Sequence, residues 1–399
     1  MKNYIMNDIC EIVTDYVANG SFATLRENVK YLNTPDFARL IRLVDYHNSY
    51  RKENAVYISK ESYEFLSKSK LFGGEIIISN VGNIGESFLC PKLQIPMSLA
   101  PNCIMIKTNQ LDKYIYYYLN SDTGKAKLMS LVSGSAIQKF NKTDFKKMKI
   151  CIHEPSEQQH IVNILGTIDD KIENNEKIYR KIEQELQLFY SKYLSKNNID
   201  KNDYNYIPLT DISEFVGGYS YKGNELVKSK CGMITIKNFD RNGGFKLDGF
   251  KDLSENNSAK PAQYVDLYDI VVAHTDLTQN AEIIGNAEII LNKKNYEKLI
   301  ASMDLVIVRP KEINNNLLYL LLHNQDFKKH ALGYCAGTTV LHLNKKALQE
   351  YKVHIPKDNK ILERISNTIS LLIAKQSQLI IKNQRLTELK RLYLKKFFG

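Results

Sequence analysis

Three acidic side chains in the second half of the chain could bind a metal ion in the way that nucleases do. Asp269 is followed by Glu282 and Glu288, and lysines lie nearby in the sequence. Carboxylates bind Mg²⁺ in such enzymes. The intervening residues supply no further element of a nuclease site, and charged side chains usually lie in solvent. We therefore predict a solvated strand face here, with no metal site and no catalytic residue.

A second candidate for chemistry is His274-Thr275-Asp276, which contains two members of a Ser-His-Asp triad. No serine or cysteine stands in a characteristic setting beside it. The chain also lacks the G-x-x-x-x-G-K-[ST] phosphate loop. It has neither the F-x-G-x-G stretch nor the Pro-Pro-Tyr/Phe element with which amino-methyltransferases bind S-adenosylmethionine and hold a flipped base. A self-contained nuclease or methyltransferase is therefore disfavoured, and binding chemistry remains.

Residues 113–149 contain eight lysines and only two acidic residues, Asp122 and Asp144. Such a stretch can contact DNA phosphates, and a solvated lysine-rich surface is the alternative. The loops "NGSFATLRENVK" (19–30) and "GGYSYKG" (217–223) carry aromatic and basic groups that could enter a groove, although ordinary turns would look the same. We predict the following DNA-contacting residues: Arg42, Lys139, Lys142, Lys146, Lys147, Tyr219, Tyr221, Lys222, Lys237, Lys345 and Lys346.

The overall composition agrees with an anionic partner. The net charge is +11 and the pI about 9.0. The six cysteines show no C-x-x-C pair and no His cluster at metal-ligand spacing, which predicts free thiols in a reducing cytoplasm. The longest apolar runs, such as "LLYLLL" at 317–322, are too short to cross a bilayer. We therefore expect a cytoplasmic protein with no membrane association.

The elements that must position these residues occur twice. Residues 133–152 match residues 336–355 at a separation of 203, with Asn141-Lys142 opposite Asn344-Lys345. The segment upstream matches at 202, and the β-branched runs 76–78 and 270–272 match at 194. Each copy begins with strand-like segments and ends with an apolar segment of helical length, which predicts a core-facing helix. The chain is thus an internal duplication.

A long helix is predicted after each copy, with apolar residues at alternating steps of four and three as in a coiled coil. Residues 154–200 carry a net charge of −3 and residues 357–399 one of +7, which favours pairing of the two helices. Antiparallel packing would make a spacer roughly 60 Å long between the copies. The predicted seam consists of Ile161, Leu165, Ile168, Ile172, Asn175, Tyr179, Ile182, Leu186, Phe189 and Tyr193, then Ile365, Ile369, Leu372, Gln376, Leu379, Asn383 and Leu386.

The stretch 149–194 resembles the central conserved region of Type I restriction–modification specificity subunits. In that family a strand, a proline turn and Glu-Gln, here Glu157-Gln158, lead into a long helix with Ile-Asp-x-Lys-Ile, here 168–172. The stretch "LTDISEFVGGYSYK" (209–222) looks like the usual opening of a target-recognition domain. The second copy departs from this pattern, since "HIPKDNKILERI" lacks the Glu-Gln pair.

The resemblance implies an α+β fold with a pseudo-twofold internal repeat. Two tandem α/β target-recognition domains, 1–153 and 201–356, would each be followed by a conserved helix, 154–200 and 357–399, and the two helices would pair as an antiparallel coiled coil.

The resemblance also implies a non-catalytic subunit that binds double-stranded DNA. Each domain would read one half of a bipartite target, while the helices set the spacing and dock two modification (methyltransferase) subunits. Restriction (motor-nuclease) subunits complete such complexes. The chain itself would hold no cofactor, with S-adenosylmethionine, ATP and Mg²⁺ on the partner subunits. A DNA-binding coiled-coil regulator or scaffold without modification subunits is the alternative.

Overall fold

The computed structural model describes residues 1–48, 50, 52, 54–134, 138–195, 200–241, 243–278 and 280–399, and of Lys201 only the backbone. The chain forms two compact units. Unit 1 contains residues 1–171 and 386–399, and unit 2 contains residues 172–385. The repeat match of residues 133–152 runs through residues 135–137, which lie outside the described part. The predicted four-part division by residue number stays a prediction, because each unit includes part of both long helices.

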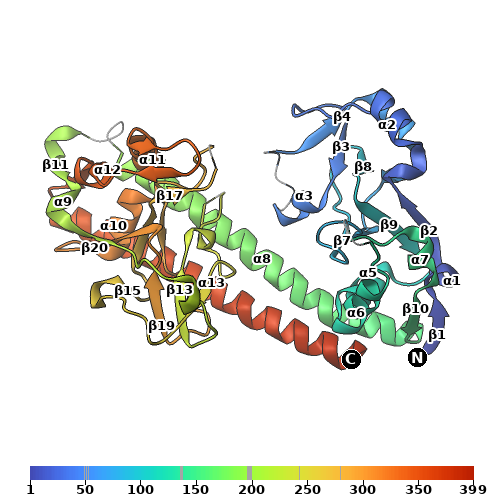
Figure 1. The fold of residues 1–399 in the computed structure, drawn as a ribbon. Coiled ribbons are helices and arrows are strands. Elements are labelled where there is room, and N and C mark those ends of the chain that lie inside the picture. The colour runs from blue at the N-terminus through green and yellow to red at the C-terminus, as the bar shows by residue number, and fades with distance from the viewer. Residues whose placement is uncertain are drawn as a thin grey trace. The chain divides into compact units, whose positions relative to one another are not determined.

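Unit 1 contains ten strands and a set of short helices (Figure 1). The strands are β1 (Lys2–Ile5), β2 (Cys10–Asp15), β3 (Ala38–Ile41), β4 (Val56–Ile58), β5 (Lys70–Leu71), β6 (Ile76–Ser79), β7 (Ser87–Leu89), β8 (Met97–Leu99), β9 (Cys103–Thr108) and β10 (Lys149–Ile152). The helices are α1 (Met6–Ile9), η1 (Tyr16–Asn19), α2 (Phe22–Asn28), α3 (Leu43–His47), α4 (Lys60–Phe65), η2 (Ser67–Ser69), α5 (Asp112–Asn120), α6 (Asp122–Ser130) and α7 (Lys142–Lys147).

Two four-stranded sheets organise unit 1, in the orders β2-β9-β6-β7 and β4-β3-β8-β5, and a separate antiparallel pair joins β1 to β10. The strand pairs are antiparallel except β3 with β8. The run Ile76-Ile77-Ile78 is wholly buried because both faces of β6 are covered. Helix α5 buries Tyr114 and Tyr117 in the same core, which confirms the core-facing helix predicted there.

Unit 2 repeats this architecture. Its strands are β11 (Tyr204–Pro208), β12 (Ser213–Gly217), β13 (Cys231–Ile234), β14 (Lys251–Leu253), β15 (Tyr264–Val265), β16 (Ile270–Ala273), β17 (Thr275–Asp276), β18 (Ala287–Ile289), β19 (Lys298–Ala301), β20 (Leu305–Pro310), β21 (Cys335–Ala336), β22 (Leu341–Leu343) and β23 (Lys352–Pro356). The helices are η3 (Lys201–Asp203), α9 (Leu209–Ile212), η4 (Gly223–Glu225), η5 (Ile236–Asn238), η6 (Pro261–Gln263), α10 (Asn315–Leu322), α11 (Gln325–Leu332) and α12 (Lys346–Gln349).

The sheets of unit 2 have the orders β12-β20-β16-β18 and β14-β13-β19-β15, and β11 pairs with β23. These are the sheets of unit 1 strand for strand, including one parallel pair, β13 with β19. Strands β17, β22 and β21 form a small third sheet, and the equivalent pairings in unit 1 are the isolated bridges of Lys139 with Val81 and with Ser133. Helix α10 is buried on every side from Leu317 to Leu322, so the second core-facing helix is also confirmed.

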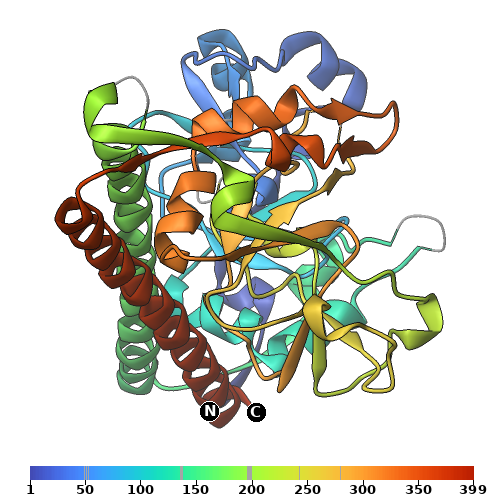
Figure 2. The same ribbon diagram turned by 90° about the vertical axis from the view of Figure 1, so that its left-hand side faces the viewer.

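The long helices are α8 (Pro155–Tyr193) and α13 (Asn359–Phe398), drawn in green and red in Figure 2. Within unit 2, Asn175 of α8 donates from Nδ2 to Oδ1 of Asn383 over 2.7 Å. Further along α8, Glu183 accepts a hydrogen bond from Gln376, which comes earlier in α13. Residue numbers therefore rise along α8 in the direction in which they fall along α13. The predicted antiparallel pairing is confirmed.

The predicted seam residues lie on α8 and α13, and their packing as one continuous seam stays a prediction. Most are buried, and the remainder, Ile172, Asn175, Tyr179, Phe189, Tyr193, Leu372, Asn383 and Leu386, are half-buried. The helices also pack on the cores of the units. In unit 1, Ile161, Leu165 and Phe398 join the core formed by α5 and the β2-β9-β6-β7 sheet. In unit 2, Ile182 and Ile369 join the corresponding core.

All six cysteines are free thiols, three of them buried and three half-buried. Among the described residues, no helix is long and apolar enough to span a membrane.

Candidate nucleic-acid interface

Four segments of unit 2 meet where strands of its first sheet end, and we call them the unit 2 loop edge: residues 217–222, 274–278, 302–304 and 341–346. The His274 N–H donates to the Asp304 carbonyl over 2.7 Å, and the Leu343 N–H donates to the His274 carbonyl over 2.9 Å. The Thr275 hydroxyl donates to the Asp304 carboxylate over 2.9 Å. These bonds join segments far apart in sequence into one rigid edge.

The first of these segments requires glycine at its start. A Cβ on Gly218 would lie 1.9 Å from the carbonyl oxygen of Ser302. The Tyr219 side chain is buried, and its hydroxyl donates to Glu225 over 2.7 Å. The Tyr219 side chain thus anchors this segment, and direct DNA contact by Tyr219 stays a prediction.

The other predicted residues of this edge face outward to differing degrees. Tyr221 is half-buried, and the Lys251 ammonium donates to its hydroxyl over 3.1 Å. Lys222, Lys345 and Lys346 are exposed. The edge therefore brings together cationic groups from stretches more than 120 residues apart, which is what phosphate binding requires.

His274 and Asp276 belong to the frame of this edge. Burial, together with the nearby His342 and Lys345, lowers the pKa of His274. Burial opposes ionisation of Asp276, but hydrogen bonds from backbone N–H groups, the shortest 2.7 Å from Ile283, lower its pKa. The Asp276 carboxylate thus caps a loop.

Unit 1 has an equivalent edge, the unit 1 loop edge, formed by residues 15–20, 79–82, 100–102 and 139–142. The Asn80 N–H donates to the Asn102 carbonyl over 3.1 Å, and the Phe140 N–H donates to the Asn80 carbonyl over 3.4 Å. These are the bonds of the unit 2 edge shifted by the separations of 194, 202 and 203 residues that the sequence repeat predicted. The duplication therefore extends to individual backbone contacts.

The predicted lysines of unit 1 lie on or beside this edge. The backbone of Lys139 forms isolated β-bridges with Val81 and with Ser133, and its side chain is exposed. Lys142 forms an ion pair of 2.8 Å with Asp15, so part of its charge is already neutralised. Lys146 is half-buried and Lys147 exposed, both in the last turn of α7. Phosphate contact by these four lysines stays a prediction.

Arg42 and Lys237 follow strands whose ends are bonded to the two loop edges: the Ala100 N–H donates to the Ile41 carbonyl, and the Ser302 N–H donates to the Ile234 carbonyl. Arg42 follows β3 and pairs with Asp45 at 2.9 Å. Lys237 lies in η5, just after β13, and is exposed. Because β3 and β13 are equivalent strands, these two cations lie at equivalent places beside the two loop edges.

The acidic residues Asp269, Glu282 and Glu288 do not form one solvated face. Asp269 lies 3.7 Å from Arg309, and Glu282 lies 3.3 Å from Arg241. Glu288 is 1% exposed and accepts a hydrogen bond of 3.0 Å from the Gly244 N–H, so our prediction of a solvated position was wrong for this residue.

Glu288 belongs to a buried charge cluster with His323 and Glu183. Burial opposes the charge of His323, but Glu183, 3.0 Å from its Nε2, raises the pKa of His323 to about 9. Burial raises the pKa of Glu288 to about 7. Nothing in the local sequence marks this cluster, since its members come from α8, β18 and the end of α10. Within the described ranges, no group of His, Cys, Asp and Glu could hold a metal ion.

Two further polar contacts of unit 1 escaped sequence reasoning, although they lie in the stretch that carried the resemblance. The buried Gln158 side chain donates to the His153 carbonyl over 2.9 Å and accepts from the Leu111 N–H. Asp169 accepts from the Tyr117 hydroxyl over 2.8 Å and pairs with Lys390 of α13 at 2.6 Å. These residues join the helices to the unit that contains them.

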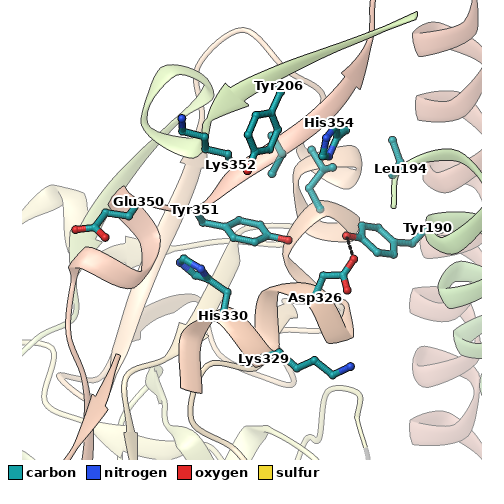
Figure 3. A pocket seen from close by; sticks show the side chains of 12 residues that line it. Tyr190, Leu194, Tyr206, Asp326, Lys329, His330, Glu350, Tyr351, Lys352 and His354 are labelled. Atoms are coloured by element: carbon teal, nitrogen blue, oxygen red, sulfur yellow. Dashed lines mark hydrogen bonds between the residues drawn. The ribbon is translucent and has the colours of Figure 1, made fainter. Parts of the chain in front are cut away.

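Unit 2 also has a cavity of about 380 Å³ between the end of α8, α11 and β23 (Figure 3). The Tyr190 hydroxyl donates to Asp326 over 3.0 Å, and the lining residues Tyr351 and His330 have tilted rings with centroids 5.0 Å apart. None of the predicted DNA-contacting residues lines it.

The chain matches one known protein family in two segments. The family described as the Type I restriction modification DNA specificity domain matches residues 1–184 and again 201–391. The chain belongs to this specificity family. The two matches coincide with the two copies of the internal repeat. The resemblance seen in the sequence and the predicted fold class are confirmed.

Relatives in the specificity family span nearly the whole chain. The Type I restriction enzyme MjaVIII specificity subunit of Methanocaldococcus jannaschii is 23% identical over 394 residues, covering 87% of this chain and 89% of the relative. The crystal structure of a Type I restriction–modification system S subunit from M. genitalium covers 100% of this chain and 96% of its own, with 17% identity and a TM-score of 0.56. At this identity the second likeness shows a shared fold.

Proposed function

We propose that this chain is the DNA sequence-recognition subunit of a Type I restriction–modification complex. Each unit binds one half of a bipartite target in double-stranded DNA through its loop edge. The observation that carries the proposal is the equivalence of the two loop edges, which share backbone hydrogen bonds but differ in side chains. Two loop edges with the same backbone structure and different side chains can bind two half-sites of different sequence.

Catalysis is assigned to partner subunits. The chain lacks the sequence motifs of phosphate loops and amino-methyltransferases. Its His-Asp stretch and acidic residues serve structural bonds and ion pairs. We propose that S-adenosylmethionine, ATP and Mg²⁺ are bound by the modification and restriction subunits, in the cytoplasm where the DNA is.

The long helices are proposed to dock two modification subunits and to set the spacing of the half-sites. Large apolar side chains point to solvent from both helices: Leu188 of α8 is 69% exposed and Leu371 of α13 is 73% exposed. Apolar groups on a helix surface favour contact with another helix. The acidic Glu157 and Asp170, which belong to the stretch that carried the resemblance, are exposed on α8 as well.

Exchange of the second unit tests the proposal. Residues 205–355 are replaced by the equivalent segment of a relative, and the chimera is expressed with its modification subunits. Methylome sequencing should show one half of the target changed and the other retained. A change in both halves would contradict one-unit-one-half reading. DNA binding without any co-purifying methyltransferase would favour the regulator or scaffold instead.

A further inference from the structure

The turn between β19 and β20 in the unit 2 loop edge has a rigid backbone. The Ser302 N–H donates to the Ile234 carbonyl over 2.9 Å, and the Leu305 N–H donates to the Ser302 carbonyl over 2.9 Å. On its other side the turn packs against Gly218. At its tip, the Met303 side chain is 53% exposed. A fixed turn therefore presents a large apolar side chain to solvent.

A second apolar side chain stands on the same edge. Leu277 is 69% exposed and directly follows Asp276, whose carboxylate fixes the loop by accepting backbone N–H bonds. Met303 itself touches the 217–222 segment, since the Ser220 hydroxyl lies 3.5 Å from its sulfur. Exposed lysines occur in the two flanking segments, Lys222 and Lys345. The centre of the edge is thus apolar and its flanks are cationic.

This arrangement matches the chemistry of a thymine in the major groove. Phosphates lie to both sides of a groove and attract ammonium groups, whereas the 5-methyl of thymine is the apolar group on the base edges. A thioether on an unbranched side chain adapts easily to such a contact. In unit 1 the equivalent position holds Pro101, which is half-buried. The apolar tip is therefore a property of unit 2.

We propose that Met303 reads the 5-methyl group of a thymine in the half-site bound by unit 2. The proposal rests on the function proposed above and adds the kind of base that this unit selects.

The test uses the full chain with its modification subunits. Selection from a randomised duplex library first gives the target. Each thymine in the half-site bound by unit 2 is then replaced, one at a time, by deoxyuridine, which removes only the methyl group. One replacement should weaken binding about fourfold, the effect of one buried methyl group. M303A should bind the thymine and deoxyuridine duplexes alike at that position, and M303L should keep most of the preference. M129A, at a methionine that is 50% exposed on α6 of unit 1, is the matched control and should keep the full preference.

The outcomes separate the two proposals. Failure of the complex to bind any sequence selectively would remove the proposed function. Selective binding with no thymine in the second half, or a thymine preference that M303A leaves intact, would overturn the assignment of Met303 alone.

Discussion

Lengthening both long helices by three heptads is expected to move the preferred DNA half-sites apart by close to one turn of the duplex. The insertions belong between residues 171 and 172 of α8 and between residues 385 and 386 of α13, where unit 1 gives way to unit 2. Placed there, they leave every contact inside each unit unchanged. A whole number of heptads also keeps the seam in phase.

The size of the effect follows from helix geometry. Twenty-one residues rise about 1.5 Å each, so each helix lengthens by roughly 32 Å. One turn of DNA measures about 34 to 36 Å, or about 10 base pairs. The optimal gap should therefore grow by about nine or ten base pairs, with each half-site presented on nearly its original face. A single heptad adds only about 10 Å, or about three base pairs. It should bind less well at every gap, because the groove has turned by about a third of a circle.

Selection from a DNA library with randomised gap lengths measures the preference, using the variant bound to its methyltransferase partners. A four-residue insertion at both points is the control, since it breaks the phase of the seam and should lower the thermal stability. An unaltered gap preference in the folded three-heptad variant would refute the spacer role and leave the helices as a docking surface.

Three other expectations are open to direct measurement. Replacing the four predicted lysines within residues 139–147 by alanine should weaken binding to all DNA sequences. It should also lower the slope of log binding constant against log salt concentration by about one unit per lost phosphate contact, and an unchanged slope would show that these lysines are solvated and do not contact phosphates. Changing both Asn175 and Asn383 to leucine should raise the melting temperature by about 2 to 4 °C while broadening the gap preference, because a polar seam pair fixes register at a cost in stability. His323 has a folded-state pKa raised to about 9, so the stability that its charged form contributes is complete below about pH 6.5 and lost as the pH rises through about 9. H323Q should weaken the pH dependence of the melting temperature over that range, and an unchanged pH profile would contradict the charged state.

The backbone of this fold was more open to prediction than its site. The separations of 194, 202 and 203 residues reappear as equivalent hydrogen bonds, because strand and turn patterns are set by local residue types. The pairing of the long helices followed from a seven-residue period and opposite charges. By contrast, the parallel pairs β3 with β8 and β13 with β19 join strands far apart in sequence, and no local pattern reports such pairing.

The side chains of the site depended on tertiary context. Tyr219 and Tyr221 have the same type and neighbouring places, yet the approach of Gly218 to Ser302 buries the first and leaves the second half-buried. Glu288 reads as an ordinary surface carboxylate until α8 and α10 bring Glu183 and His323 to it. Such differences arise from contacts between elements, and residue type alone does not contain them.

Unit 1 combines residues 1–171 with residues 386–399, and this affects the order in which the two units can fold during translation. Phe398 packs against Tyr114 and Tyr118, with ring centroids 5.4 and 5.6 Å apart, so unit 1, which begins to be made before unit 2, also needs residues that are made after unit 2. All of residues 172–385 must be translated in between, which at about 5 to 20 residues per second takes roughly 10 to 40 s. Unit 2 can therefore complete its core while unit 1 still lacks part of its own. During that interval the apolar surface that Phe398 later covers is open to chaperones or to another nascent chain, and a ribosome that stalls before residues 386–399 are made leaves unit 1, and not unit 2, unfinished.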